Sequence, residues 1–405
     1  MPIIVQKFGG TSVVTPDKRQ QVAAKVKAAL DERYKVVVVV SAMGRTGDPY
    51  ATDSLIQIAR EVFKQVKPRE LDLLMACGEI ISTVMMVQTL KAYGIEAVAF
   101  TGGQAGIITD HHFNNARIKE IKPNNVLNCL DEGKVAVVAG FQGITADGEI
   151  TTLGRGGSDT TGAAMGVALK AEVVEIYTDV EGVMTADPRL VPQAKPLDIM
   201  TYQELCEMAH LGAKVVHPRA VEIAMEGRVP LRIRSTFSDS RGTLISDGTP
   251  IGSIEIRRDQ TVTGLAHIAG MSLVKLQSQT DLNQNGVVLE IFEMMAKAGI
   301  SVDMIQVAPF QIGFILSEQF EEQAKQLLEC LDLIVTIETG YAKVAIVGSG
   351  MRGVPGVMAK MVKGLRQAGI SIYHSTDSHI NIACLVKQED MSKALQALHT
   401  EFDLA

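Results

Sequence analysis

Short apolar runs alternate with helix-length segments through the first 245 residues of the chain. The runs lie at residues 3–5, 36–40, 97–100, 135–139, 173–177 and 231–233. Short runs that stay hydrophobic without alternation are typical of strands covered on both faces, as in a parallel sheet flanked by helices. The pattern therefore predicts an α/β domain over residues 1–245, with a mostly parallel central sheet and helices on both faces.

The rest of the chain repeats itself without gaps at an offset of 70 residues. The tetrapeptide AGIS at 298–301 recurs at 368–371, and QIGFILSE at 311–318 is matched by NIACLVKQ at 381–388. One tetrapeptide could recur by chance, but an unbroken offset over both segments indicates a true internal repeat.

Each copy of the repeat reads strand, helix, strand, strand, helix, and an apolar tail such as 334–337 adds a last strand. This order predicts two small βαββαβ units of the ferredoxin-like kind. We place them at 246–337, including a linker, and at 338–405. Because one unit of this size buries little surface, the two are expected to pair and bury a shared face.

Composition narrows the class of protein. The 405 residues suit two or three domains, and 46% hydrophobic with 21% charged residues is ordinary for a globular protein. A net charge of −7 without a long basic run excludes a nucleic-acid partner. Five scattered cysteines, an N-terminus without signal-peptide character and apolar runs too short to span a bilayer predict a soluble cytoplasmic protein outside the membrane.

The histidines and serines argue against two common chemistries. None of the eight histidines falls in a metal-spaced cluster, so no metal site is predicted. No serine lies in a GxSxG elbow, which disfavours a hydrolase of that type.

The segment QKFGGTS at 6–12 follows the first strand. The consecutive Gly9 and Gly10 allow backbone N–H groups to approach an anion closely, and Lys7 supplies a mobile positive charge. The segment therefore suits a phosphate, although a glycine turn beside a solvated lysine explains it equally well.

The segment TTLGRGGSDTTG at 151–162 joins a strand pattern to an Ala-rich helix pattern. Its glycines permit a tight turn, and Ser158 or Asp159 is expected to cap the helix that follows. The planar guanidinium of Arg155 suits a carboxylate. The alternative is an ordinary capped turn, but capping alone does not require the arginine.

The segment IYTDVEGVMTADPR at 176–189 leaves a strand at the edge where parallel sheets bind ligands, which makes Thr178, Asp179 and Arg189 candidates. Taken alone, the segment is better explained as an ordinary surface loop. Glu79 could pair with an ammonium group, and Lys214 could bind an anion, although each alone is typical of a solvated side chain. Together these anion-binding, carboxylate-pairing and ammonium-pairing groups indicate a kinase that acts on an amino acid.

The chain resembles the aspartate kinases of the amino acid kinase superfamily. The motifs that carry the resemblance occur in the family's order: KFGGTS, SAMG, RELDLLMACGE, GFQG, TTLGRGGSDTTG, IYTDVEGVMTADPR and GAKVVHPRA. The tandem repeat looks like the family's two ACT domains. The resemblance implies transfer of the γ-phosphate of ATP to the β-carboxylate of L-aspartate, giving 4-phospho-L-aspartate for lysine, threonine and methionine synthesis. ATP would be the co-substrate and would bring Mg²⁺ with it.

The resemblance also assigns roles to residues, position by position. Lys7, Asp159 and Lys214 would serve catalysis. The ATP site would be formed by Lys7, Gly9, Gly10, Ser12, Thr178, Asp179, Met184, Arg189, Lys214 and Val215. The aspartate site would be formed by Ser41, Thr52, Glu79, Phe141, Arg155, Gly156 and Ser158. In it, Arg155 would bind a carboxylate and Glu79 the ammonium group.

The chain departs from the family pattern in one loop of the kinase domain. The loop SAMGRTGDPYATDSL is longer than the family's SAMG-x-x-TDEL, so that Thr46 or Thr52 could contact the substrate. Thr52 is favoured because TDSL resembles TDEL.

In the repeats the resemblance implies lysine and/or threonine as feedback effectors and a homodimer formed through the ACT domains. The effector positions would be Asp281, Gly286, Gln306, Met351 and Ser375. The loops SQTDLNQNG and HSTDSH depart from the family pattern there, and the alternative is that the repeats only dimerise the enzyme.

Two further functions compete with this assignment. A catalytically silent amino-acid sensor would need none of the charged residues that the chain retains in its kinase motifs. A kinase for glutamate or acetylglutamate would generally lack the ACT pair and would differ from GRGGSDTT.

Overall fold

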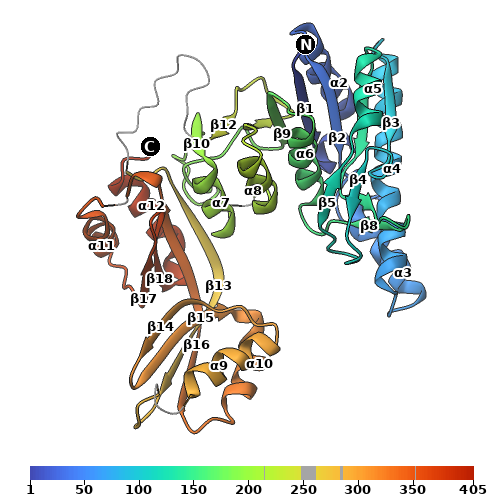
Figure 1. Cartoon of the computed structure of the whole chain (residues 1–405). Coiled ribbons are helices and arrows are strands. Elements are labelled where there is room, and N and C mark those ends of the chain that lie inside the picture. The colour runs from blue at the N-terminus through green and yellow to red at the C-terminus, as the bar shows by residue number, and fades with distance from the viewer. Residues whose placement is uncertain (214, 248–260, 283–285, 352) are drawn as a thin grey trace. The chain divides into compact units, whose positions relative to one another are not determined.

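A computed structural model of the chain describes residues 1–213, 215–247, 261–282, 286–351 and 353–405 (Figure 1). Its described residues divide into two compact units. The first takes in residues from 1–183, 196–209 and 215–247, and the second takes in residues from 184–195, 210–213 and 261–405.

The described part of the first unit is built on an eight-stranded sheet with the strand order β10-β12-β11-β9-β1-β2-β6-β3. All neighbouring strands are parallel except β11 and β12. The strands are β1 (Ile3–Phe8), β2 (Lys35–Val40), β3 (Ala97–Phe100), β6 (Val135–Ala139), β9 (Val173–Thr178), β10 (Ile199–Thr201), β11 (Leu231–Ser235) and β12 (Thr243–Ser246). The predicted mostly parallel sheet is confirmed, and each apolar run of the sequence is one of its strands.

Helices cover both faces of this sheet, as predicted. On one face, Val22 and Val26 of α2 and Leu90 of α4 pack with the sheet residues Val38 and Tyr177. On the other face, α6 lies against β1 and β9. The helices of the first unit are α1 (Gly10–Val13), α2 (Pro16–Asp31), α3 (Thr52–Val62), α4 (Pro68–Ala92), α5 (Asn124–Asp131), α6 (Gly157–Ala168), α7 (Tyr202–His210) and α8 (Pro218–Glu226).

The glycines of α6 explain how closely that helix approaches the sheet. A Cβ at Gly162 would lie 3.1 Å from the side chain of Lys7, and a Cβ at Gly166 would collide with Val174. Small residues on this face therefore bring the first turn of α6 to the end of β1, where the chemistry of the sequence motifs is gathered.

A second, four-stranded sheet in the described part of this unit has the order β5-β4-β7-β8. Its strands are β4 (Ile107–Thr109), β5 (Ile118–Ile121), β7 (Gln142–Ile144) and β8 (Ile150–Thr152). Strand β8 leads directly into the turn that carries Arg155.

Helix α4 is long and apolar enough to cross a membrane by length and hydropathy alone, with a mean hydropathy of 1.6 over its most apolar window. Half of that window is buried inside the protein, and the helix also buries the carboxylates of Asp72 and Glu79. These features are typical of a core helix in a globular domain.

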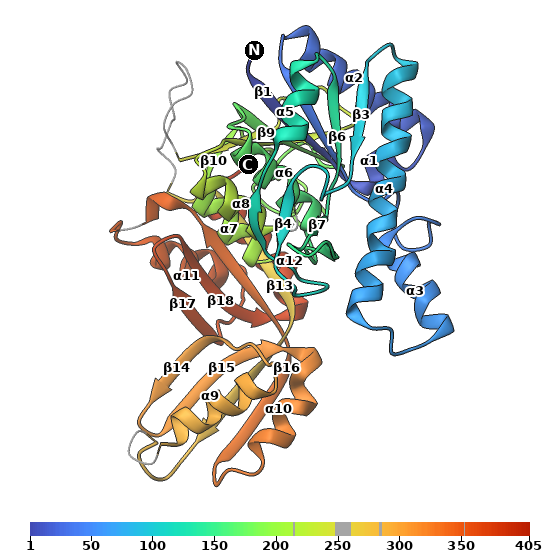
Figure 2. The same cartoon turned by 45° about the vertical axis from the view of Figure 1, so that its right-hand side comes forward.

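The described part of the second unit contains a six-stranded sheet with the order β14-β15-β13-β16-β18-β17. Its strands are β13 (Gly264–Gln277), β14 (Asp303–Ala308), β15 (Gln311–Ser317), β16 (Ile334–Val347), β17 (His374–Asp377) and β18 (Asn381–Lys387). Its α-helices are α9 (Val287–Lys297), α10 (Glu321–Leu328), α11 (Val357–Gln367) and α12 (Met391–Glu401), with short 3₁₀ turns η1 (Glu318–Phe320), η2 (Ser349–Met351) and η3 (Gln388–Asp390). Figure 2 shows α9 and α10 together on one face of the strands of the first copy, where Ile291 and Leu328 pack against Phe314.

The repeat offset of 70 residues holds at the level of elements. Helix α9 begins and ends 70 residues before α11, and the same is true of β15 and β18. Gly286 and Gly356, which precede the paired helices, both have positive φ, at 70° and 93°. The predicted order strand, helix, strand, strand, helix is confirmed in both copies, and the last strand predicted at 334–337 is confirmed for the first copy.

One strand pairing departs from the sequence-based description of two successive copies. The first half of β13, Gly264–Ala269, pairs antiparallel with residues 342–347 of β16, which belong to the second copy. The second half of β13 pairs with 334–338 of β16, within the first copy. The first copy is therefore inserted between two pieces of sheet that belong to the second, so the predicted segment 246–337 is not one separate body.

The predicted boundary at residue 245 also differs from the compact units, because 184–195 lies in the second unit. Val183 is buried in the first unit, where its N–H donates to Thr243 Oγ1 at 2.8 Å. Two residues later, Thr185 is buried in the second unit, and its hydroxyl lies 2.9 Å from His399 Nε2. Ala186 and Val191 belong to the apolar core of the second copy, which explains why this segment leaves the first unit.

Candidate active site

A cavity of about 730 Å³ in the first unit gathers most of the predicted substrate groups. Its walls come from the ends of β1 and β2, from α3 and α4, and from the turn between β8 and α6. All seven residues assigned to the aspartate site line it: Ser41, Thr52, Glu79, Phe141, Arg155, Gly156 and Ser158. Lys7, Gly10 and Asp159 line it as well.

Lys7 and Asp159 form an ion pair at the centre of this group, with 2.6 Å between Nζ and Oδ1. Lys7 is only 8% exposed, near the end of β1, and Asp159 lies in the first turn of α6. The other carboxylate oxygen of Asp159 accepts a hydrogen bond from the backbone N–H of His217 at 3.3 Å. The carboxylate therefore holds the lysine ammonium in one place in the wall of the cavity.

The prediction that Ser158 or Asp159 caps α6 is wrong. The helix begins at Gly157, its N-cap is Gly156, and no side chain makes the capping hydrogen bond. Gly156 has a φ of 72°, which is costly for other residues, and a Cβ there would collide with the ring of His217. The serine and aspartate therefore lie inside the first turn and are available to the cavity.

Glu79 is the most perturbed carboxylate of the cavity. It is 2% exposed on α4, and burial raises its pKa to about 8, against the opposing effect of the Ala42 N–H that donates to Oε1 at 3.0 Å. Its Oε2 is buried and has no hydrogen-bond partner among the described residues. A buried carboxylate oxygen without a donor in a substrate cavity is suited to an ammonium group.

Arg155 and Thr52 complete the charged and polar lining. Arg155 is exposed in its turn and makes no ion pair within the described residues, so its guanidinium is free to meet a carboxylate. Thr52 is the first residue of α3 and lines the cavity. Thr46 is not part of the lining, and its hydroxyl donates to Asp53 Oδ2 at 2.7 Å.

The predicted phosphate loop is built closely against its neighbours. The N–H of Gly9 donates to Tyr177 O at 3.3 Å, and the N–H of Gly44 donates to Gly10 O at 3.1 Å. A Cβ at Gly10 would collide with the carbonyl of Ala42. Gly10 is therefore required by the close approach of two backbone segments.

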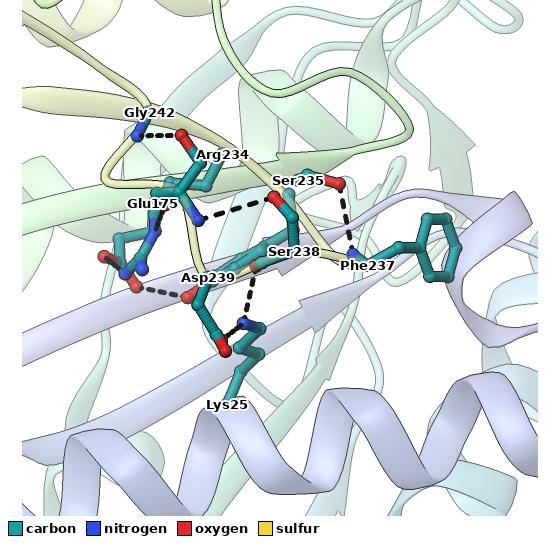
Figure 3. A network of polar contacts seen from close by, with 10 residues as sticks. Lys25, Glu175, Arg234, Ser235, Phe237, Ser238, Asp239 and Gly242 are labelled. Carbon is teal, nitrogen blue, oxygen red and sulfur yellow. Dashed lines mark hydrogen bonds and ion pairs between the residues drawn. The ribbon is translucent and has the colours of Figure 1, made fainter.

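Ser12 is fully buried, and its hydroxyl lies 2.7 Å from that of Thr236. The segment after β11 that contains Thr236 is in turn fixed to the sheet and to α2, as Figure 3 shows: Arg234 pairs with Glu175 at 2.9 Å, and Lys25 pairs with Asp239 at 2.7 Å. This polar network holds the phosphate loop through Ser12.

The remaining residues assigned to ATP are not gathered in the cavity. Thr178 ends β9, and Asp179 lines a neighbouring hollow of about 330 Å³ and pairs with Arg45 at 2.8 Å. Val215 is half-buried in the first unit. Met184 and Arg189 belong to the second unit, where Arg189 pairs with Asp187 at 2.6 Å. Lys214 lies outside the described residues.

Sequence reasoning missed Asn114, which lines the cavity and has a φ of 66°. Its side-chain Oδ1 is buried without a hydrogen-bond partner in the described part of the chain. It also missed Asp72, a fully buried carboxylate on α4. Asp72 precedes Glu79 by two helical turns in RELDLLMACGE, and this spacing on one helix face was the signal that could have identified it.

No three His, Cys, Asp or Glu side chains come together as a metal site within the described ranges. Asp159 and Asp179, the two aspartates assigned to catalysis and to the ATP site, are each already paired with a cation.

In the second unit, a cavity of about 420 Å³ lies where β14 meets the segment around β17. It is lined by Gln306 and Ser375, two of the predicted effector positions, with Ile305 and residues 372–374. The ring of His374 donates from Nε2 to Met304 O at 2.6 Å and so joins the two copies at this point.

The other predicted effector positions do not line this cavity. Gly286 precedes α9 as its N-cap, Asp281 lies in the turn before it, and Met351 is buried in the core of the second copy.

Comparison with known proteins agrees with the motifs. The sequence profile of the amino acid kinase family matches residues 2–235, and that of an ACT domain matches 336–400. Aspartokinase 1 of Bacillus subtilis is 47% identical over 407 aligned residues, which cover 100% of both chains.

Solved structures agree as well. Aspartokinase III of E. coli in complex with aspartate and ADP, described as the R-state, is 28% identical with a TM-score of 0.77, and the match covers 98% of this chain and 99% of that one. The same enzyme in complex with lysine and aspartate, described as the T-state, has a TM-score of 0.78 at 28% identity and covers 99% of both chains. Because a full-length relative of this identity and the family profile agree, the chain belongs to the aspartokinases of the amino acid kinase family.

Proposed function

We propose that the chain transfers the γ-phosphate of ATP to the β-carboxylate of L-aspartate to give 4-phospho-L-aspartate. The observation that carries this proposal is the single cavity that contains an unpaired guanidinium at Arg155, a buried carboxylate at Glu79 and the Lys7–Asp159 ion pair. An α-amino dicarboxylic acid presents the complementary groups: one ammonium and two carboxylates.

We assign the binding of the amino acid to two charged groups that line the cavity. Glu79 binds the ammonium group and Arg155 a carboxylate, so that the second carboxylate of the substrate is directed toward Lys7. Ser41, Thr52, Ser158 and the turn at Gly156 supply hydrogen bonds, and Phe141 closes one wall. Binding both ends orients the acceptor oxygen for in-line attack on the γ-phosphorus.

Lys7 neutralises charge on the phosphoryl group as it moves, and Asp159 keeps the ammonium of Lys7 in place. Phosphoryl transfer depends on positioning and charge neutralisation more than on covalent chemistry, so these groups suffice on the protein side. Gly9 and Gly10, with the buried Ser12 behind them, form the loop assigned to the phosphates, and Thr178, Asp179, Lys214 and Val215 are assigned to the rest of the nucleotide.

ATP would bring Mg²⁺ with it, and the metal would neutralise charge on the phosphates. Within the described residues, Asp159 is paired with Lys7 and Asp179 with Arg45. The enzyme acts in the cytoplasm, where ATP and free amino acids are both present.

Lysine, threonine or both act as feedback effectors in the second unit, and two chains form a dimer through the ACT domains. The cavity with Gln306 and Ser375 supports the first part, and the E. coli relative that has been solved with lysine supports the choice of amino acid. Regulation of this kind requires two states of the enzyme with different affinity for the effector.

The test is hydroxylamine trapping of the acyl phosphate in the presence of ATP and Mg²⁺. Aspartate should give hydroxamate, whereas glutamate and acetylglutamate should not. The absence of hydroxamate from aspartate would refute the proposed reaction and favour a non-catalytic sensor, and product from glutamate alone would identify a different acyl-phosphate kinase.

The same assay tests regulation. Added lysine, threonine or the two together should lower the rate, and Gln306→Ala or Ser375→Ala should relieve this inhibition. Gln326→Ala, on the exposed face of α10, is the matched control and should leave inhibition unchanged. Inhibition by neither amino acid would reject the regulatory part, and sedimentation of the chain as a monomer would reject the dimer.

A further inference from the structure

Asp72 is a carboxylate with no exposed surface in the wall behind the substrate cavity. It accepts hydrogen bonds from the backbone N–H of Asn114 (2.9 and 3.0 Å to its two oxygens), from the backbone N–H of Thr152 (2.8 Å) and from the hydroxyl of Thr152 (2.7 Å). A fully buried carboxylate is costly to desolvate, and bonds from several directions hold it in one orientation. The three groups that donate to it come from two segments distant from α4 in the sequence.

Those two segments run side by side and form one wall of the cavity. The N–H of Ala116 donates to Thr152 O at 2.9 Å, which joins the segment containing Asn114 to the end of β8. Thr152 is followed by Leu153, by the turn residue Gly154 and by Arg155. Thr152, one of the two residues bonded to Asp72, therefore lies three positions before Arg155, the residue assigned to the substrate carboxylate.

Arg219 of α8 binds the same pair of segments. Its guanidinium donates to Leu153 O and to Ala116 O, each at 3.1 Å. Each residue bonded by Arg219 is one or two positions from a residue bonded by Asp72. The base of the Arg155 turn is thus held by a carboxylate that accepts N–H groups and by a guanidinium that donates to carbonyls.

Helix α4 forms another part of the cavity wall. Leu71, Met75 and Glu79 of this helix line the cavity. Asp72 and Glu79 are seven residues apart, which places them on the same face of the helix, two turns from each other. Asp72 therefore links the helix that carries Glu79 directly to the strand that leads into the Arg155 turn.

We propose that Asp72 is a positioning residue for the acceptor amino acid, because it fixes the separation between Glu79 on α4 and Arg155 on the turn after β8. It does not touch the substrate. This inference rests on the proposed function and extends it, since it assigns the recognition of substrate length to a residue outside the cavity. A change of Asp72 should alter aspartate binding and leave the nucleotide side, built on β1 and β9, as it is.

Two variants test the link, and a third controls for burial. Asp72→Asn keeps the shape but turns an amide NH₂ toward N–H donors, and Thr152→Val removes one donor while keeping the backbone bond. Thr151→Val is the matched control: Thr151 is as fully buried as Thr152 on the same strand, and its hydroxyl lies 2.6 Å from that of Thr109, not near Asp72. Strand alternation directs the two hydroxyls to opposite faces of β8.

Steady-state kinetics on the purified full chain measure the effect. Because misplacement of a binding group by about 1 Å can cost up to about a hundredfold, Asp72→Asn should raise the KM for aspartate at least about tenfold and Thr152→Val about threefold. The KM for ATP should stay within about twofold in both variants, and Thr151→Val should leave both constants unchanged.

Melting temperatures of all variants show whether each is folded. If Asp72→Asn fails to fold, the KM values of Thr152→Val alone test the proposal. Equal increases in the KM for aspartate and for ATP, or an effect of Thr151→Val as large as that of Thr152→Val, would overturn the proposal. Wild-type chain that forms no aspartyl phosphate would instead refute the proposed function, so the two failures are distinguishable.

Discussion

The Nζ of Lys7 and the Oδ1 of Asp159 lie 2.6 Å apart, joining the end of β1 to the first turn of α6. The two residues are 152 positions apart in the chain and meet because Gly162 lets α6 approach β1 closely. A buried lysine held by one carboxylate is oriented before the substrate arrives, which is the condition for electrostatic catalysis.

Replacing Lys7 by methionine should lower kcat by about a hundredfold to a thousandfold, because it removes the charge that meets the moving phosphoryl group. Lys35→Met is the matched control, since Lys35 lies at the start of the neighbouring strand and pairs with Asp131 over the same 2.6 Å. Rates measured by coupled assay should separate the two variants. Equal kcat values for Lys7→Met and wild type would exclude the catalytic role.

The two glycines of the phosphate loop should differ sharply in their tolerance of alanine. A Cβ at Gly10 would collide with Ala42 O, whereas at Gly9 the nearest atoms lie 3.7 and 3.8 Å away. Gly10→Ala should therefore displace the SAMG loop and reduce activity by at least about tenfold. Gly9→Ala should keep the melting temperature of the wild type, and an equally active Gly10→Ala would contradict the packing argument.

Arg155→Ala should raise the KM for aspartate far more than the KM for ATP, by about a hundredfold against about twofold, because a charge-assisted bidentate bond is lost. Arg69→Ala removes an exposed arginine that pairs with Glu149 and serves as the control. A rise in the KM for ATP alone would move Arg155 to the nucleotide side.

Glu79 should make aspartate binding depend on pH. Its pKa of about 8 means that the free enzyme holds a proton there at neutral pH, while an ammonium group requires the charged form. The KM for aspartate should therefore fall as the pH rises from about 6.5 to 8.5, with release of a proton on binding. A KM for aspartate that does not change with pH in the wild type would argue against Glu79 as the group that binds the ammonium.

Glu79 should also make the stability of the fold depend on pH: a rise in pH that improves aspartate binding should lower stability. Between its ordinary pKa of 4.5 and about 8, Glu79 is protonated in the folded chain and ionised in the unfolded chain, so stability is lost as the pH rises through this window. Glu79→Gln removes this loss. Its melting temperature should match that of the wild type near pH 5 and exceed it by several degrees at pH 8.5.

Two ion pairs in the network behind the phosphate loop should contribute very differently to stability. Glu175 is 5% exposed and bonds to Arg234, Gln6 and Tyr177, so Glu175→Ala should destabilise the fold by about 3 kcal/mol because it leaves buried partners unpaired. Asp239 pairs with Lys25 from a fully exposed position, and Asp239→Ala should leave the denaturation midpoint unchanged. Similar losses of stability in both variants would show that burial does not determine how much an ion pair contributes.

Much of the fold could be predicted because it follows from local patterns. Buried parallel strands are uninterrupted apolar runs, as at 36–40, and the repeat offset places α9 and α11 on matching segments. The pairing of 264–269 with 342–347 could not be predicted. The hydrophobic pattern of a segment indicates that it is a strand, but it does not indicate which distant strand will pair with it.

The site shows the same division. Lys7, Arg155 and Asp159 stand in glycine-rich motifs whose composition is unusual, and these motifs pointed to the cavity. Asp72 and Asn114 lack such a context, since an aspartate in a helix and an asparagine in a polar loop are both typical of solvated residues. The cap of α6 was predicted wrongly because Gly156, with its positive φ, is the N-cap, and the helix begins at Gly157, one residue before Ser158.

The passage of the chain from Val183 to Thr185 bears on how the enzyme can be shortened. A protein ending at residue 245 would retain every motif of the kinase domain, yet Ala186 and Val191 would lose the apolar core that covers them, and Thr185 would lose His399. The second half of the segment 176–189 would then lose the side chains that cover it. Gene fragments cut at the apparent end of the kinase sequence should therefore yield proteins that aggregate, and relief from feedback is better sought by point substitution than by removal of the repeats.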